Sequence, residues 1–164
     1  MTFKMNIEQL HKELPMSLPT EIGDKLQFFL RSNADQQMRF IIFLGQQINF
    51  EVLIKTLRLA ISVEPIFSYF YKDEMGKAYW QKQNEIDETL LIDLIEMRDD
   101  LNSEINRFLT LEISPFIFPL VKVRVIRKDQ KDIICINMNH TPTDGSGLKQ
   151  FVKTMASIYT NLQL

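Results

Sequence analysis

Residues 133–148 read Ile-Ile-Cys-Ile-Asn-Met-Asn-His-Thr-Pro-Thr-Asp-Gly-Ser-Gly-Leu, and this stretch decides the fold. A β-branched, apolar run stops at His140, a turn with Pro and Gly follows, and an amphipathic segment begins near Asp144. The pattern predicts a strand over 132–140 that gives way to a helix. His140, one of two histidines in the chain, then lies at the junction between strand and helix.

The segments before this stretch predict further strands and helices. Residues 39–44 are nearly all apolar, which indicates a central strand covered on both faces. Asn49 is a plausible N-cap for the helix that follows it. The other expected strands span 66–71, 77–82, 90–96 and 116–127, with Pro119 marking a bulge or a sheet edge and 128–131 a charged turn. The expected helices span 6–14, 21–30, 50–61 and from Asp99 or Asp100 to about Leu111.

This order of elements predicts the fold class. Helices are added to a mixed sheet without regular βαβ alternation, so we expect an α/β (α+β) fold. Its architecture is a two-layer sandwich with helices mainly on one face of the sheet. We expect residues 1–164 to form a single domain, with residues 1–17 as a peripheral N-terminal helix.

Composition excludes several classes of function. The chain has 164 residues, 45% of them hydrophobic, and a net charge of −2, which gives no indication of a nucleic-acid partner. No apolar run approaches the ~20 residues of a membrane span, and the N-terminus lacks the apolar core of a signal peptide. The single cysteine, Cys135, permits no internal disulfide and is expected to be a small core residue. We therefore expect a cytoplasmic location.

The residues at the last junction allow a chemical and a structural interpretation. Alternation places His140 on the same strand face as Ile136 and Met138. A neutral imidazole there is a base near neutral pH. Asp144 caps the helix or holds the turn through an arginine, and Gly145 removes a side chain where a ligand could approach. In the structural alternative, all three only shape the turn.

Two other kinds of site find less support. His140 and Asp144 would supply two metal ligands, but the only other histidine, His11, is distant in sequence, so no metal is expected. Ser146 lies close to His140, yet no strand–Gly-x-Ser-x-Gly–helix elbow surrounds it. A Ser-His-Asp nucleophile system is therefore not predicted.

Residues 139–145, Asn-His-Thr-Pro-Thr-Asp-Gly, resemble the H-H-x-x-x-D-G motif of the chloramphenicol acetyltransferase-like superfamily. This superfamily includes condensation domains of nonribosomal peptide synthetases and alcohol acetyltransferases. Residues 39–44 and 50–61 look like its first long strand and the following helix, and 64–80 look like its helix-end and hairpin region. The resemblance covers residues 18–164 and only the N-terminal lobe, which is half of a pseudo-dimer.

The resemblance implies an acyl transfer centred on His140. As general base, His140 would take a proton from a hydroxyl or amine, which attacks an acyl thioester of coenzyme A or phosphopantetheine. Asp144 would order the loop through an arginine, and Gly145 would keep the tunnel open. Asn139 stands at the first motif histidine, a position that is usually supportive. The thioester is a substrate, and no covalently bound cofactor is implied.

The resemblance also implies partners. Residues 66–70 contain no arginine, so either Arg39 or Arg124 pairs with Asp144, or Asp144 only caps the helix. Relatives consist of two lobes, so the expected partners are a missing C-terminal lobe or a second copy of the chain, and an acyl-carrier protein. Alone, one lobe is expected to be a poor catalyst. The alternatives are a non-catalytic interaction module of the same ancestry and an unrelated α/β domain with a similar turn.

Overall fold

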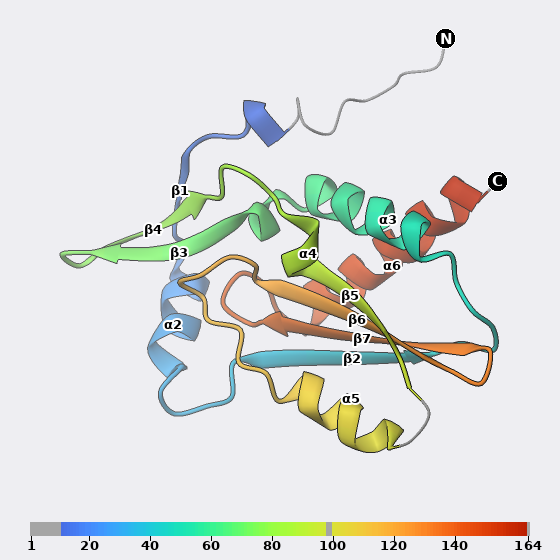
Figure 1. Cartoon of the computed structure of the whole chain (residues 1–164). Coiled ribbons are helices and arrows are strands. Elements are labelled where there is room, and N and C mark those ends of the chain that lie inside the picture. The colour runs from blue at the N-terminus through green and yellow to red at the C-terminus, as the bar shows by residue number, and fades with distance from the viewer. Residues whose placement is uncertain (1–10, 98–99, 164) are drawn as a thin grey trace, which may run out of the picture.

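The computed structural model describes residues 11–97 and 100–163, which form two sheets with helices packed on them (Figure 1). In chain order, the elements are β1 (Ser17–Pro19), α2 (Ile22–Leu30), β2 (Gln37–Phe43), α3 (Phe50–Val63), η1 (Pro65–Ser68), β3 (Tyr69–Glu74), β4 (Lys77–Lys82), α4 (Glu88–Leu91), β5 (Ile92–Glu96), α5 (Leu101–Leu109), β6 (Val121–Lys128), β7 (Lys131–Asn139) and α6 (Gly145–Gln163). The helix predicted over 6–14 and the peripheral helix predicted over 1–17 lie largely outside the described residues. In the part that is described, residues 11–13 are helical.

The larger sheet has the strand order β2-β7-β6-β5 and is mixed, because β5 runs parallel to β6 while the other pairs are antiparallel. Helices α3 and α6 pack on one face, and the shorter α5 packs on the other. This arrangement confirms the α/β fold class. Strands β1, β4 and β3 form a second, antiparallel sheet of three strands, which the sequence did not separate from the first.

Strand β7 is the centre of the molecule, and its side chains alternate between two cores. Ile134, Ile136 and Met138 belong to the large core beneath α3 and α6. Cys135 belongs to the smaller core beneath α5. Burial raises the pKa of the Cys135 thiol to about 11, so the thiol remains protonated near neutral pH. The prediction of a small core cysteine is confirmed.

Strand β2 lies at the edge of the larger sheet, so its predicted central position was wrong. Among the described residues, its only strand neighbour is β7. Arg39, Ile41 and Phe43 are exposed, and Phe43 retains 69% of its accessible surface. A continuous apolar run fits a strand buried on both faces. Here, however, α5 packs over β7 and leaves the same face of β2 open.

Three further boundaries differ from the sequence prediction. The strand expected over 90–96 begins at Ile92, because residues 88–91 form the short helix α4. The cis peptide bond Phe118–Pro119 lies before β6, which begins at Val121 as an inner strand, so Pro119 marks neither a bulge nor an edge. Residues 65–68 form the 3₁₀ helix η1 rather than the start of a strand. Pro65 explains this difference, because its fixed φ favours the first turn of a helix.

The β6–β7 hairpin is tied to the start of α3 by one buried carboxylate. Asp132 is fully buried and accepts hydrogen bonds from Arg127 Nε and Nη2, both at 2.9 Å. It also accepts one from the backbone N–H of Ile48 at 2.9 Å. Burial opposes ionisation, but these bonds outweigh it and lower the pKa of Asp132. The charged form therefore stabilises the folded state.

We expect Asp132→Asn to lower the free energy of unfolding at pH 7 by about 3 kcal/mol, because it leaves Arg127 without its buried partner. A carboxyl group whose pKa is lowered by folding stabilises the folded state at pH values above the pKa that the group has in the unfolded chain. This stabilisation is lost as the pH falls. The difference from the wild type should therefore shrink below the ordinary pKa of 3.8. Urea unfolding of both proteins at several pH values measures this difference in the free energy of unfolding. Asp129→Asn, in the exposed turn, is the control, and equal losses in both variants would contradict the prediction.

Candidate active site

His140 follows directly after β7, at the point where the chain leaves the larger sheet. Its backbone N–H donates to the carbonyl oxygen of Gln36 at 2.8 Å, which continues the β2–β7 pairing by one residue. Its own carbonyl oxygen accepts from the N–H of Thr143 at 3.3 Å and closes the turn. The side chain is half-buried beyond Met138, as the alternation predicts. The strand therefore holds the imidazole at the rim of the sheet.

The turn contains polar atoms that the described chain does not satisfy. Four buried side-chain atoms lack a hydrogen-bond partner among the described residues, and three of these are His140 Nδ1, Thr141 Oγ1 and Gln36 Oε1. Buried polar atoms are nearly always paired in folded proteins. His140 Nδ1 is therefore suited to a hydrogen bond from solvent or a bound molecule. Thr141 and Gln36 line a separate polar cavity together with Asn139. Neither residue was predicted from the sequence, and only Thr141, inside the motif, could have been.

Asn139 faces away from His140 and holds the segment before β6. Its Nδ2 donates to the carbonyl oxygen of Ile113 at 2.6 Å, and its Oδ1 accepts from the N–H of Thr141 at 2.9 Å. The side chain is 1% exposed. Both the nitrogen and the oxygen of the Asn139 side-chain amide therefore hold the turn at residues 139–145 in place. This arrangement agrees with the supportive role that the resemblance implies for the position.

Asp144 caps helix α6 and has no arginine partner in the part of the chain that the structure describes. Its Oδ1 accepts from the N–H of Gly147 at 2.8 Å. Arg39 pairs instead with Asp35 at 2.6 Å, and Arg124 pairs with Asp93 and Glu104. Of the two alternatives for Asp144, the pairing with Arg39 or Arg124 was therefore wrong, and the structure shows the helix cap. Because Asp144 is exposed at a helix N-terminus, water and the helix dipole stabilise its charge without a cation.

The two glycines of the turn differ in their surroundings. A Cβ added at Gly145 would meet no described atom within 4 Å. One added at Gly147 would overlap the hydroxyl oxygen of Thr143 and lie 3.2 Å from its Cβ. Within the described chain, the close approach that requires glycine is at Gly147. The role of Gly145 beside a tunnel depends on groups outside these residues and stays a prediction.

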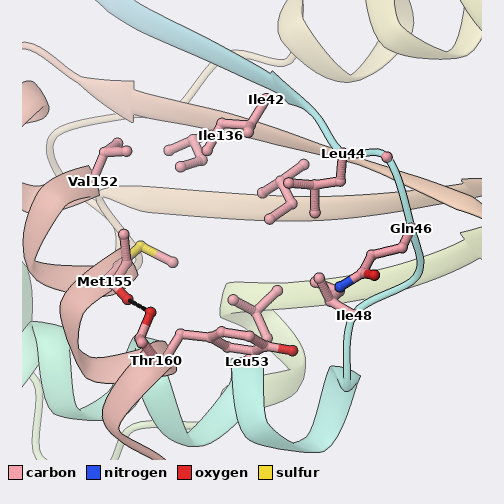
Figure 2. Close-up of a pocket in the computed structure, with 13 residues that line it drawn as sticks. Ile42, Leu44, Gln46, Ile48, Leu53, Ile136, Val152, Met155 and Thr160 are labelled. Atoms are coloured by element: carbon pink, nitrogen blue, oxygen red, sulfur yellow. Dashed lines mark hydrogen bonds between the residues drawn. The ribbon is translucent and has the colours of Figure 1, made fainter. Parts of the chain in front are cut away.

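Two cavities lie on opposite faces of the sheet. A polar cavity of about 610 Å³ is lined by Asn139, Thr141 and Gln36, with residues 31–39 and 110–116 around them. An apolar cavity of about 650 Å³ lies between the sheet and α6, where Ile42 and Ile136 face Val152 and Met155 (Figure 2). Buried Met138 separates Ile136 from His140 along β7. The apolar cavity is therefore distinct from the surroundings of His140.

No group of three or more His, Cys, Asp or Glu side chains in residues 11–97 and 100–163 is arranged to hold a metal ion. None of the helices in these residues is long and apolar enough to cross a bilayer.

Known structures share the fold described above. The starter condensation domain of rhizomide synthetase RzmA superposes with a TM-score of 0.74 at 11% identity, over 90% of this chain and 38% of that one. The epimerization domain from the third module of tyrocidine synthetase B gives 0.71 at 16% identity, over 90% and 35%. The chain has the fold of one lobe of a condensation domain. This confirms the resemblance seen in the motif.

A third structure extends the comparison. The SgcC5 protein of Streptomyces globisporus gives a TM-score of 0.71 at 14% identity, over 89% of this chain and 37% of that one. This chain thus spans well under half the length of each of these condensation-fold proteins. Neither a protein-family model nor a curated protein matches its sequence.

We expect Gly147→Ala to lower the free energy of unfolding by about 1–3 kcal/mol, because the new methyl group overlaps Thr143. Thr143→Ala removes the overlapping oxygen, so the double variant should recover most of the loss. Gly145→Ala, in the same turn, is the matched control and should be neutral. Urea unfolding of the four proteins measures these differences. Equal destabilisation by Gly145→Ala, or no recovery in the double variant, would contradict this account of the turn.

Proposed function

We propose that this chain is the lobe of an acyltransferase that carries the general base, His140, and that it moves an acyl group from a thioester to a hydroxyl or amine. The observation that carries the proposal is the position of the imidazole, half-buried at the rim of the sheet with its Nδ1 unpaired among the described residues. The condensation-domain fold supports it, because that fold is the one that the resemblance in the motif implies.

The proposed reaction needs one base and no redox partner. The neutral imidazole accepts the proton of the acceptor hydroxyl or amine while the acceptor oxygen or nitrogen attacks the thioester carbonyl carbon. The carbon–sulfur bond then breaks, and the leaving thiolate takes the proton from the imidazolium. The donor is an acyl thioester of coenzyme A or of a carrier-protein phosphopantetheine arm.

A complete site requires groups beyond those described. Preorganised donors that stabilise an oxyanion contribute about 3 kcal/mol each to catalysis. The proposal assigns these donors and the opposite wall of the substrate tunnel to a second lobe, because this chain spans only 38% of the RzmA starter condensation domain. Where the donor is a phosphopantetheine thioester, an acyl-carrier protein is the proposed partner that delivers it.

A non-catalytic interaction module with the same fold is the second candidate. Asn139 occupies the first histidine position of the motif, and Asp144 caps α6 without an arginine. Both features stabilise the turn whether or not a proton is transferred there. In this function, the chain binds another protein through its surface and turns over no thioester.

The experiment measures acyl transfer from octanoyl-pantetheine to a primary amine, with the amide product detected by mass spectrometry. With a second condensation-domain lobe supplied, we expect product above the protein-free background, and a fall of at least about 100-fold in His140→Gln because the base is removed. His11→Gln is the matched control, since it alters the only other histidine. Equal rates in wild type and His140→Gln, or a wild type that stays at background with the second lobe present, would reject the proposal, and the latter outcome favours the interaction module.

A further inference from the structure

One edge of β2 has no partner in the part of the chain that the structure describes. The N–H of His140 bonds to Gln36, and the N–H of Leu44 bonds to Asp132, so the even-numbered residues of this segment face β7. In an antiparallel pair, successive residues direct their N–H and C=O groups to opposite sides. The backbone groups of Arg39, Ile41 and Phe43 therefore point away from the sheet. No described residue hydrogen-bonds to them.

This edge lacks the features that keep sheet edges from pairing. Proteins protect such edges with Pro, lysines, bulges or very short strands. Strand β2 is seven residues long, contains no Pro, and pairs with β7 in unbroken register. Its one charged residue, Arg39, is held by Asp35 at 2.6 Å and by the carbonyl oxygen of Leu109 at 2.6 Å. Ile41 and Phe43 are left 36% and 69% exposed.

When two copies of β2 are aligned antiparallel and centred on Ile41, the side chains that come to lie opposite each other are complementary. We propose that two copies of this chain pair antiparallel along β2, with Ile41 of each copy opposite Ile41 of the other, and so join their larger sheets into one. Arg39 then lies opposite Phe43 of the second copy, and the outward-pointing groups of both strands meet. This register forms about six backbone hydrogen bonds.

The side chains of the paired strands also match on both faces. On the α6 side, Phe40 lies opposite Ile42 of the second copy, at the apolar cavity that Ile42 and Leu44 line. On the α5 side, the two Ile41 side chains meet across the axis, and the Arg39 guanidinium lies beside a Phe43 ring. No like charges face each other. This match is the reason for assigning the edge to a second copy rather than to an unrelated strand.

The pairing register is restricted by Gln37. Its N–H already donates to Asp35 Oδ1 at 2.9 Å, and its carbonyl oxygen accepts from Arg39 Nη1 at 3.4 Å. A register shifted toward Gln37 would lose these bonds or leave partners unpaired. A register centred on Ile41 uses the backbone N–H and C=O groups of Arg39, Ile41 and Phe43, which have no partner among the described residues. The pairing goes beyond the proposed acyl transfer, and its test does not depend on that activity.

Light scattering during size-exclusion chromatography tests the pairing. At tens of micromolar, we expect a mass near twice the 19.3 kDa of the chain. Ile41→Glu places two carboxylates opposite each other and should raise the dimer dissociation constant at least 100-fold, and Ile41→Lys should act likewise. An equimolar mixture of Ile41→Glu and Ile41→Lys should form dimers again, because opposite charges then meet. Ile41→Val is the conservative control and should remain dimeric.

Ile41→Pro provides a second variant, since it removes one outward N–H and no bond to β7. Circular dichroism and urea unfolding establish that each variant is folded. A monomeric wild type would overturn the proposal and would leave the edge to a second lobe or to another protein. A dimer that persists in folded Ile41→Glu, Ile41→Lys and Ile41→Pro would also overturn it, because the interface would then lie elsewhere.

Discussion

The burial of β7 on both faces is the constraint from which the rest of the structure follows. All its residues from Asp132 to Asn139 are buried, so each side chain needs a partner above or below the sheet. Alternate residues supply apolar contacts to α3 and α6 on one face. On the other, Asn137 and Asn139 hydrogen-bond to the chain that follows α5. A shift of one residue would put these amides in the apolar core. The register is therefore fixed, and with it the position of His140.

The turn at residues 139–145 is stabilised by hydrogen bonds rather than by an ion pair. Asn139 connects the turn to Ile113, and Asp144 accepts a helix N–H without a salt-bridge partner among the described residues. These bonds join residues of this chain alone, so the turn can form in a single lobe. The Nδ1 atom of His140 has no partner among the described residues. The turn is therefore held by this chain, and the proposed chemistry depends on the groups that meet the imidazole.

The features that sequence could predict were those set by local pattern. Asn49 and Asp100 cap helices as expected, since their side chains accept N–H bonds three residues on. The hairpin at 128–131 and the strand ending at His140 follow from turn chemistry and alternation. The edge position of β2 could not be predicted, because the same apolar sequence pattern is compatible with a central strand and with an edge strand that no helix covers. The partners of Arg39 and Arg124 depend on which distant carboxylates the fold brings near them.

The buried thiol has a practical consequence. Only the thiolate attacks alkylating reagents, and Cys135 is both inaccessible and held protonated by its surroundings. Because it is the sole cysteine, its rate of alkylation reports how often the strand at the centre of the molecule opens to water. A cysteine introduced at the surface would react first, so spectroscopic labels can be attached selectively without replacing the native residue.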